Sequence, residues 1–227
     1  MALEPDADAL ERLLHGRWSC RAFDPAPVPR PVIERLLTLA QRTPSWCNTQ
    51  PWQLVLFSGD ATARLATALL ARQRSGAPEA PDMPFPPPYR GEHLARRREC
   101  GFQLYEAVGV QRGDRAGATA QAEENFRFFG APHFALMTVL RDLGPYGAVD
   151  CGGYVSVFLL AARALGLAAI PQAAVAAHSV WLRDHLGLPE DRAVVCGISF
   201  GFPAPDHPAN AFRTTRAPLD QVVDWRD

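Results

Sequence analysis

The sequence has no closely spaced cysteine pair, no long hydrophobic run and almost no net charge. Its five cysteines are widely separated, which argues against a disulfide framework and against a structural zinc site. The most apolar stretch, near 155–170, is interrupted by Arg163 and Gly166, so no membrane span is expected. With 23 basic and 24 acidic side chains the net charge is -1. Non-specific electrostatic binding to nucleic acid or to an anionic membrane is therefore not expected.

The common catalytic and nucleotide-binding signatures are missing too. There is no GxGxxG after a strand, no GxxxxGK[ST], no HExxH and no GxSxG. The six histidines have no metal-like spacing, so no metal site is expected. If the chain is an enzyme, its reactive group is expected to come from a cofactor. The acidic, amphipathic start resembles neither a signal peptide nor a basic transit peptide, and the cytoplasm is the expected location.

Hydrophobic periodicity predicts a few short strands among a larger number of helices. Strands are expected at 53–59, at 133–140, at 193–201 and from 167, with a break at Pro171. Helices are expected at 6–15, 32–42, 61–74, 91–110, 114–129, 147–166 and 178–190. Because strands and helices do not alternate regularly, the pattern favours an α+β fold over a doubly wound sheet.

Two segments stand out in this pattern. The helix at 147–166 is apolar on nearly all sides, as is typical of a core centre or an obligate interface. Residues 75–90 are rich in proline and are predicted to be an extended excursion, not a domain boundary. Residues 1–227 are thus expected to form a single domain, in which 75–130 is a variable lid or excursion region.

The first candidate site is a short basic segment near the N-terminus. In an extended backbone Arg17, Ser19 and Arg21 point to the same side. Two guanidiniums and a hydroxyl on one edge suit a phosphate or a polyol-phosphate chain. The alternative is a strand edge that carries surface charges.

Two further segments could add to such a site. The loop PSWCNTQPW at 44–52 presents amide and hydroxyl side chains that can pair with both donors and acceptors, as the pyrimidine edge of a flavin requires. Its alternative is an ordered turn with Trp46 and Trp52 in the core. The tail RTTR at 213–216 again places guanidiniums beside hydroxyls, and taken alone it is a solvated tail.

The order of these motifs resembles the nitroreductase family. RxSxR is followed by PSxxNxQPW, by a Pro-Gln turn after a buried helix, and by N-x-x-R-x-x-R-x-P-L-x-x-V near the C-terminus. The resemblance runs from about residue 10 to residue 225 and is weak over 75–130. Within the family the sequence is most similar to a subgroup that includes nitrobenzoate reductases.

The resemblance implies an intertwined homodimer with a central mixed or antiparallel sheet flanked by helices, and with FMN held between the subunits. It places a first group of residues around the FMN phosphate, ribityl chain and ring: Arg17, Trp18, Ser19, Arg21, Arg213 and Arg216. It assigns Ser45, Asn48 and Gln50 to contacts from the other subunit. It places Pro171, Gln172 and Ala173 in a turn beside the flavin ring.

Some positions depart from the family pattern or carry a weaker assignment. Thr214 stands where many members have a lysine, and Arg213 is a candidate substitute. A middle-region asparagine contact of many members has no equivalent at 75–95. Cys47, and Phe128 or Phe129, are candidates for the substrate pocket, with core filling as the alternative for both phenylalanines.

The resemblance implies an FMN-dependent oxidoreductase that uses NAD(P)H to reduce nitroaromatic or quinone-type acceptors by a ping-pong mechanism. Small planar aromatic molecules would be the substrates. Such a reaction needs no catalytic base from the protein, in keeping with the absence of an acid–base motif. Two alternatives remain open: a specialised flavin enzyme on the same fold, such as a dehalogenase or an oxidase, and a non-catalytic flavin-binding protein.

Overall fold

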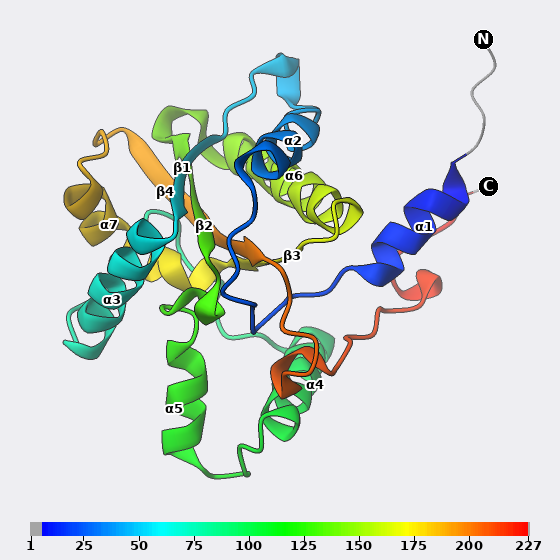
Figure 1. Ribbon diagram of the computed structural model, residues 1–227. Coiled ribbons are helices and arrows are strands. Elements are labelled where there is room, and N and C mark those ends of the chain that lie inside the picture. The colour runs from blue at the N-terminus through cyan, green and yellow to red at the C-terminus, as the bar shows by residue number, and fades with distance from the viewer. Residues whose placement is uncertain (1–5, 227) are drawn as a thin grey trace.

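A computed structural model describes residues 6–226, which fold around one four-stranded sheet (Figure 1). The strands are β1 (Gln53–Ser58), β2 (His133–Leu140), β3 (Ala168–Gln172) and β4 (Arg192–Gly201). They lie in the order β1-β2-β4-β3, and each neighbouring pair is antiparallel. The predicted α+β class is confirmed, and the sheet takes the antiparallel of the two expected forms.

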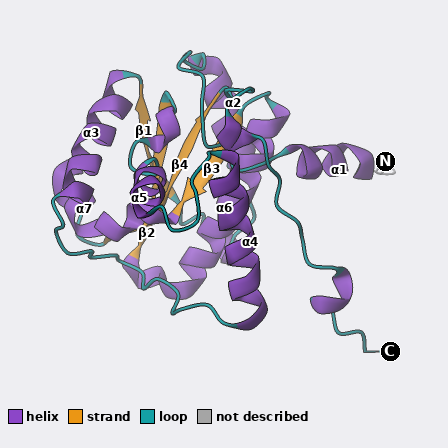
Figure 2. Ribbon diagram, turned by 90° about the horizontal axis from the view of Figure 1, so that it is seen from below, coloured by secondary structure: helices purple, strands orange, loops and turns teal. Residues whose placement is uncertain are grey.

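Helices cover both faces of this sheet (Figure 2). On one face lie α2 (Arg30–Ala40) and the long α6 (Gly144–Ala164), and on the other lie α3 (Asp60–Arg74) and α7 (Ser179–Leu186). Helices α4 (Gly91–Ala107) and α5 (Arg115–Glu123) lie beyond one end of the sheet (Figure 1). Helix α1 (Ala7–Gly16) projects from the side on which the C-terminal end also lies.

The central strand β2 explains why helices pack on both faces. Successive strand side chains point to opposite faces. Met137 and Val139 pack with the core beside α2 and α6, whereas Phe134 and Leu136 pack with the core beside α3 and α7. Each fully buried side chain of this size stabilises the fold by about 1.5–3 kcal/mol.

Two expected boundaries are wrong. Pro171 does not break a strand, because β3 runs through it to Gln172. β3 is the outermost strand of the sheet, where a missing N–H is tolerated. The helix expected at 114–129 ends at Glu123 as α5. Phe128 and Phe129 have φ angles of +56° and +54°, which no α-helix allows.

The proline-rich segment is extended, as predicted, and it is anchored through Asp82. The carboxylate of Asp82 accepts hydrogen bonds from Arg141 and Arg183, each at 2.5 Å, and from the Val194 amide at 2.8 Å. Its side chain is only 4% exposed. Burial alone would raise the pKa of Asp82, but the amide and the two guanidiniums outweigh it and hold the pKa below its ordinary value. This carboxylate ties the segment to the sheet.

A second buried polar group, His133, stands at the start of β2. Its Nε2 accepts a hydrogen bond from the Val28 amide at 2.9 Å, and its Nδ1 lies 2.9 Å from the Ser58 hydroxyl. Burial lowers the pKa of His133. An imidazole that accepts an amide hydrogen bond must be neutral, so the contact and the lowered pKa agree.

A helix that crosses a bilayer must be both long and apolar. Across residues 6–226, no helix combines the length and the apolar character needed to cross a membrane. The most apolar helix, α6, buries one face only, with Tyr154 and Phe158 in the core and Tyr146 and Val149 exposed.

Candidate functional site

The basic segment at 17–21 lies between the sheet and the C-terminal tail. Ser19 forms a parallel bridge with Ala169 of β3, and the Cys20 amide donates to the Ala169 carbonyl at 3.3 Å. Four residues after Cys20, the Asp24 amide donates to the Phe202 carbonyl at 2.9 Å. The segment therefore has β3 on one side and the chain that leaves β4 on the other.

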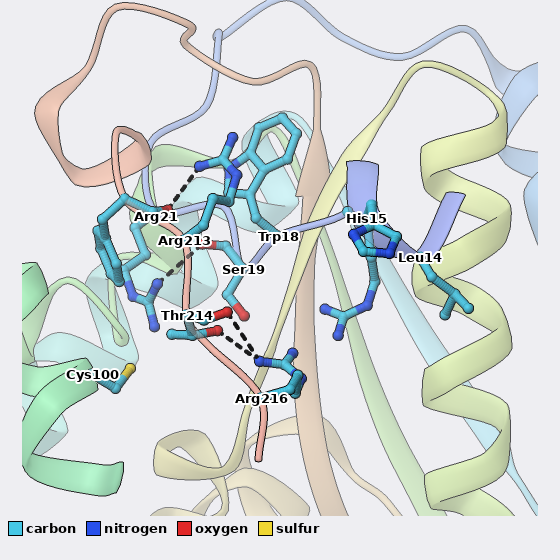
Figure 3. A pocket seen from close by; sticks show the side chains of 11 residues that line it. Leu14, His15, Trp18, Ser19, Arg21, Cys100, Arg213, Thr214 and Arg216 are labelled. Carbon is cyan, nitrogen blue, oxygen red and sulfur yellow. Dashed lines mark hydrogen bonds between the residues drawn. The ribbon is translucent and has the colours of Figure 1, made fainter. Parts of the chain in front are cut away.

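This placement creates a cavity of about 660 Å³ (Figure 3). Two arginine clusters line it, one made of Arg17 and Arg21 and the other of Arg213 and Arg216. Among the residues that the structure describes, no aspartate or glutamate lines it. A cavity that presents four guanidiniums and two hydroxyl side chains is suited to an anion such as a phosphate ester. The lining residues are Leu14, His15, Arg17, Trp18, Ser19, Arg21, Cys100, Phe212, Arg213, Thr214 and Arg216.

The two N-terminal arginines differ in how they are held. The guanidinium of Arg17 makes no hydrogen bond within residues 6–226, so its donors are free for a ligand. Arg21 donates to the Ser19 carbonyl at 3.1 Å and lies 5.5 Å from the centre of the Phe212 ring. Burial lowers the pKa of Arg21. A cation that is so poorly hydrated attracts an anion more strongly than one in open water.

The two tail arginines are braced by their own backbone. Arg216 donates to the Thr214 hydroxyl at 3.0 Å (Figure 3). It also donates to the Thr215 carbonyl at 2.8 Å. Arg213 donates to the Asn210 carbonyl at 2.7 Å, and its guanidinium lies 4.4 Å from the centre of the Trp18 ring. Arg213 therefore lines the cavity but is largely used to pack Trp18 and the tail.

The ring of Trp18 packs against guanidiniums from two parts of the chain, the C-terminal tail and α6. Besides Arg213, the Arg163 guanidinium of α6 lies 6.0 Å from its ring centre. The indole Nε1–H is buried and has no hydrogen-bond partner in the part of the chain described. Cation–π packing of this kind stabilises by about 0.5–2 kcal/mol per contact. It fixes the wall of the cavity on the side of α6.

The PSWCNTQPW loop lies at a separate cavity of about 670 Å³, bordered by α2. Asn48 and Gln50 line it, and the Ser45 hydroxyl accepts a hydrogen bond from the Gln50 amide at 2.9 Å. Asn48 and Gln50 have positive φ angles of 56° and 48°. Such strained backbone persists only where the surroundings impose it, and it is frequent at binding sites. Within one chain, these polar groups do not share the cavity of the arginines.

The Pro-Gln turn contributes backbone, not side chain. The Gln172 amide group is buried: its Nε2 donates to the Asn125 carbonyl at 2.7 Å and its Oε1 accepts from the Ser199 hydroxyl. Both polar atoms of this side chain therefore have partners inside the chain, and these contacts fix the end of β3. Pro171 is half-buried and Ala173 is exposed, so the turn offers a ligand its main-chain groups.

The three substrate-pocket candidates differ in how far they are exposed to solvent. Cys47 is exposed, with a φ of +51°. Phe128 is fully buried and stacks on Phe134 with ring centres 3.8 Å apart, and Phe129 is buried among Cys20 and Ile170. Both phenylalanines are buried in the core, which favours core filling, the alternative considered for them, over a role in the substrate pocket.

Several residues that line the cavity or support its lining were not singled out from the sequence. Asn210 stands in the tail motif, but only the fold shows that its buried amide contacts the N-terminal segment. Cys100 of α4 and His15 of α1 enter the lining from elements whose sequence gives no such signal. Phe212, between two residues of the motif, packs against Arg21.

Comparisons with known proteins agree with this geometry. A family model described as "Nitroreductase family" matches residues 14–202. A nitroreductase NfnB of Mycolicibacterium smegmatis is 36% identical over 222 residues, which cover 96% of this chain and 92% of that protein. A 4-nitrobenzoate reductase of a Nocardioides species is 31% identical, with 98% and 93% covered.

A solved structure gives the same result in three dimensions. The crystal structure of the FMN-dependent nitroreductase NfnB from Mycobacterium smegmatis in complex with NADPH superposes with a TM-score of 0.93 at 34% identity. The superposition covers 98% of this chain and 100% of that one. The predicted fold is confirmed, and the chain belongs to the nitroreductase family.

Proposed function

We propose that this protein is an FMN-dependent oxidoreductase that uses NAD(P)H to reduce nitroaromatic or quinone-type acceptors. The observation that carries the proposal is the cavity in which Arg17, Arg21 and Arg216 converge without an opposing carboxylate. The relatives add support, because they include an FMN-dependent nitroreductase in complex with NADPH and 4-nitrobenzoate reductases.

The lining residues fit the groups of FMN. Arg17, Ser19 and Arg216 would bind the phosphate and the ribityl chain, since a phosphate pairs best with guanidiniums and hydroxyls. Arg21 would place a poorly hydrated positive charge beside an anionic edge of the ligand. The exposed backbone after Pro171 would provide main-chain contacts. FMN, when bound, supplies hydride acceptance and donation, so the chain itself has to bind, orient and exclude water.

We also propose a homodimer in which the second subunit completes the site. Apolar side chains are exposed on three elements of one chain: Leu10 and Leu14 on α1, Tyr146 and Val149 on α6, and Trp225 in the tail. Helix α1 buries none of its residues within the chain. Large exposed apolar surface of this kind is typical of an obligate interface. The loop at 44–52, which lies at its own cavity, would then reach the flavin of the partner through Ser45, Asn48 and Gln50.

The remaining parts of the proposal concern organisation and location. The chain is one domain, in which residues 75–130 carry the proline-rich segment, α4 and α5 as a variable excursion beside the cavity. Cys47, exposed on its strained loop, is the remaining candidate of the three considered for contact with a small planar aromatic substrate. We place the protein in the cytoplasm.

Rapid mixing tests the activity directly. The purified protein, reconstituted with FMN, is mixed with NADPH or NADH without oxygen, and absorbance near the flavin band is followed. The proposal predicts loss of the band and its return when a nitroarene or a quinone is added. A protein that keeps FMN but is not reduced by either nucleotide would be a flavin-binding protein without this activity, and the proposal would be wrong.

A further inference from the structure

Asn210 joins the two ends of the chain where the arginine clusters meet. It lies in a short 3-10 turn, Pro208–Asn210, and is 5% exposed. Its Oδ1 accepts a hydrogen bond from the Arg21 amide at 2.8 Å, across 189 positions of sequence. Its Nδ2 donates to the Ala22 and Ala204 carbonyls, each at 2.9 Å. Both amide protons and one oxygen lone pair of the side chain are thus used.

The backbone of the same residue holds the second cluster. The Asn210 carbonyl accepts a hydrogen bond from the Arg213 guanidinium at 2.7 Å, and this guanidinium packs on Trp18. One residue therefore fixes the main chain of Arg21 with its side chain and orients Arg213 with its carbonyl. Asparagine suits this place because it offers an acceptor and two donors on a short side chain that a buried turn can accommodate.

Other contacts between the two ends do not depend on this side chain. The Asp24 amide donates to the Phe202 carbonyl at 2.9 Å, and the Ala204 amide donates to the Ala22 carbonyl at 3.0 Å. These bonds would keep the two ends together if the amide of Asn210 were removed. Within the described chain, the Arg21 amide has Asn210 as its hydrogen-bond acceptor. Loss of that side chain would free the backbone of Arg21 to shift relative to the tail while the fold persists.

From this geometry we propose that Asn210 is a positioning residue for the flavin phosphate. Through its bonds to Arg21 and Arg213 it ties the segment that carries Arg17 to the tail that carries Arg216, the two arginines assigned to the phosphate, and it does so without contacting the ligand. The inference rests on the proposed FMN binding and deepens it, because it assigns phosphate selectivity to a residue outside the ligand contacts. It further implies that Asn210 matters for FMN and matters little for riboflavin, the same flavin without the phosphate.

The test compares the two flavins on the full-length protein. Apoprotein of the wild type and of Asn210→Ala is titrated with FMN and with riboflavin, and flavin fluorescence gives each Kd. For Asn210→Ala the Kd for FMN should rise at least about tenfold, whereas the Kd for riboflavin should stay within about twofold. The ratio of the two constants is a readout that general destabilisation does not change selectively.

A matched control separates positioning from stability. Thr62 is a buried polar residue on α3 whose hydroxyl donates to the Pro132 carbonyl at 3.1 Å, and it does not line the cavity. Thr62→Ala should lower the thermal midpoint of the apoprotein and leave the ratio of the two flavin constants at the wild-type value. If Asn210→Ala does not fold, Asn210→Ser, which keeps a small hydroxyl, takes its place. Its ratio of the riboflavin Kd to the FMN Kd should be lower than that of the wild type but still above one.

The outcomes are distinct. If the Asn210 variants weaken FMN and riboflavin equally, or leave the Kd for FMN unchanged, Asn210 does not position the phosphate-binding arginines and the inference is overturned. If the wild-type apoprotein binds neither flavin, the proposed function fails and the inference fails with it.

Discussion

Arg17 offers the sharpest test of the proposed cofactor site. Its guanidinium lines the cavity and makes no hydrogen bond within residues 6–226, so Arg17→Ala removes a proposed ligand contact without breaking a side-chain hydrogen bond inside the described chain. A hydrogen bond to a charged group contributes about 1.5–3 kcal/mol. Arg17 is half-buried, and solvent screening favours the lower part of that range.

This energy converts into a measurable change in affinity. About 1.5–2 kcal/mol corresponds to a Kd for FMN that is roughly 10 to 30 times higher. The variant should therefore purify with less yellow colour, while its unfolding midpoint as apoprotein and its mass by light scattering stay at the wild-type values. Titration of apoprotein with FMN by fluorescence gives the Kd, and the ratio of flavin to protein absorbance gives the occupancy.

Arg30→Ala is the matched control. Arg30 is an exposed arginine at the start of α2, paired with Glu34 at 2.8 Å and absent from the cavity lining. It should change neither occupancy nor Kd. A fully yellow Arg17→Ala protein with an unchanged Kd would refute the assignment of Arg17 to the phosphate, because loss of a charged hydrogen bond to the ligand must weaken binding.

Three further predictions follow from other groups. Asp82→Asn should lower the free energy of unfolding by about 1.5–3 kcal/mol at pH 7, measured with urea, because the half-buried Arg183 and the exposed Arg141 lose their anionic partner. The pKa of Asp82 is held down in the folded state, so the difference from wild type should shrink as the pH falls below about 4, and a gap that stays constant would contradict this. His133 has a lowered pKa when folded, so its contribution is complete above about pH 6.5 and is lost as the pH falls below that value; His133→Gln should flatten the stability profile there, and parallel profiles would count against it. Val149→Arg should give monomers that bind FMN poorly, whereas a change at the exposed Val180 of α7, Val180→Arg, should leave the dimer intact, as light scattering would show; a dimeric Val149→Arg protein would exclude this face of α6 from the interface.

The strands and most helices follow from local pattern, and the places where prediction failed have physical causes. Alternation and apolar runs located β1, β2 and β4, because buried strands leave that signal. Pro171 was misread since a proline breaks a central strand, and nothing local reveals that β3 lies at the edge of the sheet. The end of α5 was missed because the backbone at Phe128 turns inward to stack on Phe134, a tertiary contact.

The residues of the site also separate into those that local geometry predicts and those that depend on tertiary contacts. That Arg17, Ser19 and Arg21 share a side followed from extended geometry, and the structure places all three in one cavity with Arg216. The contribution of Asn210 could not be foreseen, because its partners are 189 and 188 positions away in the sequence. The place of Gln172 beside the flavin stays a prediction, and the bonds of its side-chain amide to Asn125 and Ser199 are contacts that no motif encodes.

The union of both chain ends in one cavity has a consequence for how the protein matures. During synthesis Arg21 emerges 189 positions before Asn210, and so long before the tail arginines that follow it. Contacts that close so long a loop form late in folding, because the entropy of closure must be met by interactions already in place. A nascent chain that has not yet reached Arg216 therefore lacks part of the lining of the anion-binding cavity, and cofactor binding indicates that synthesis has passed the tail arginines.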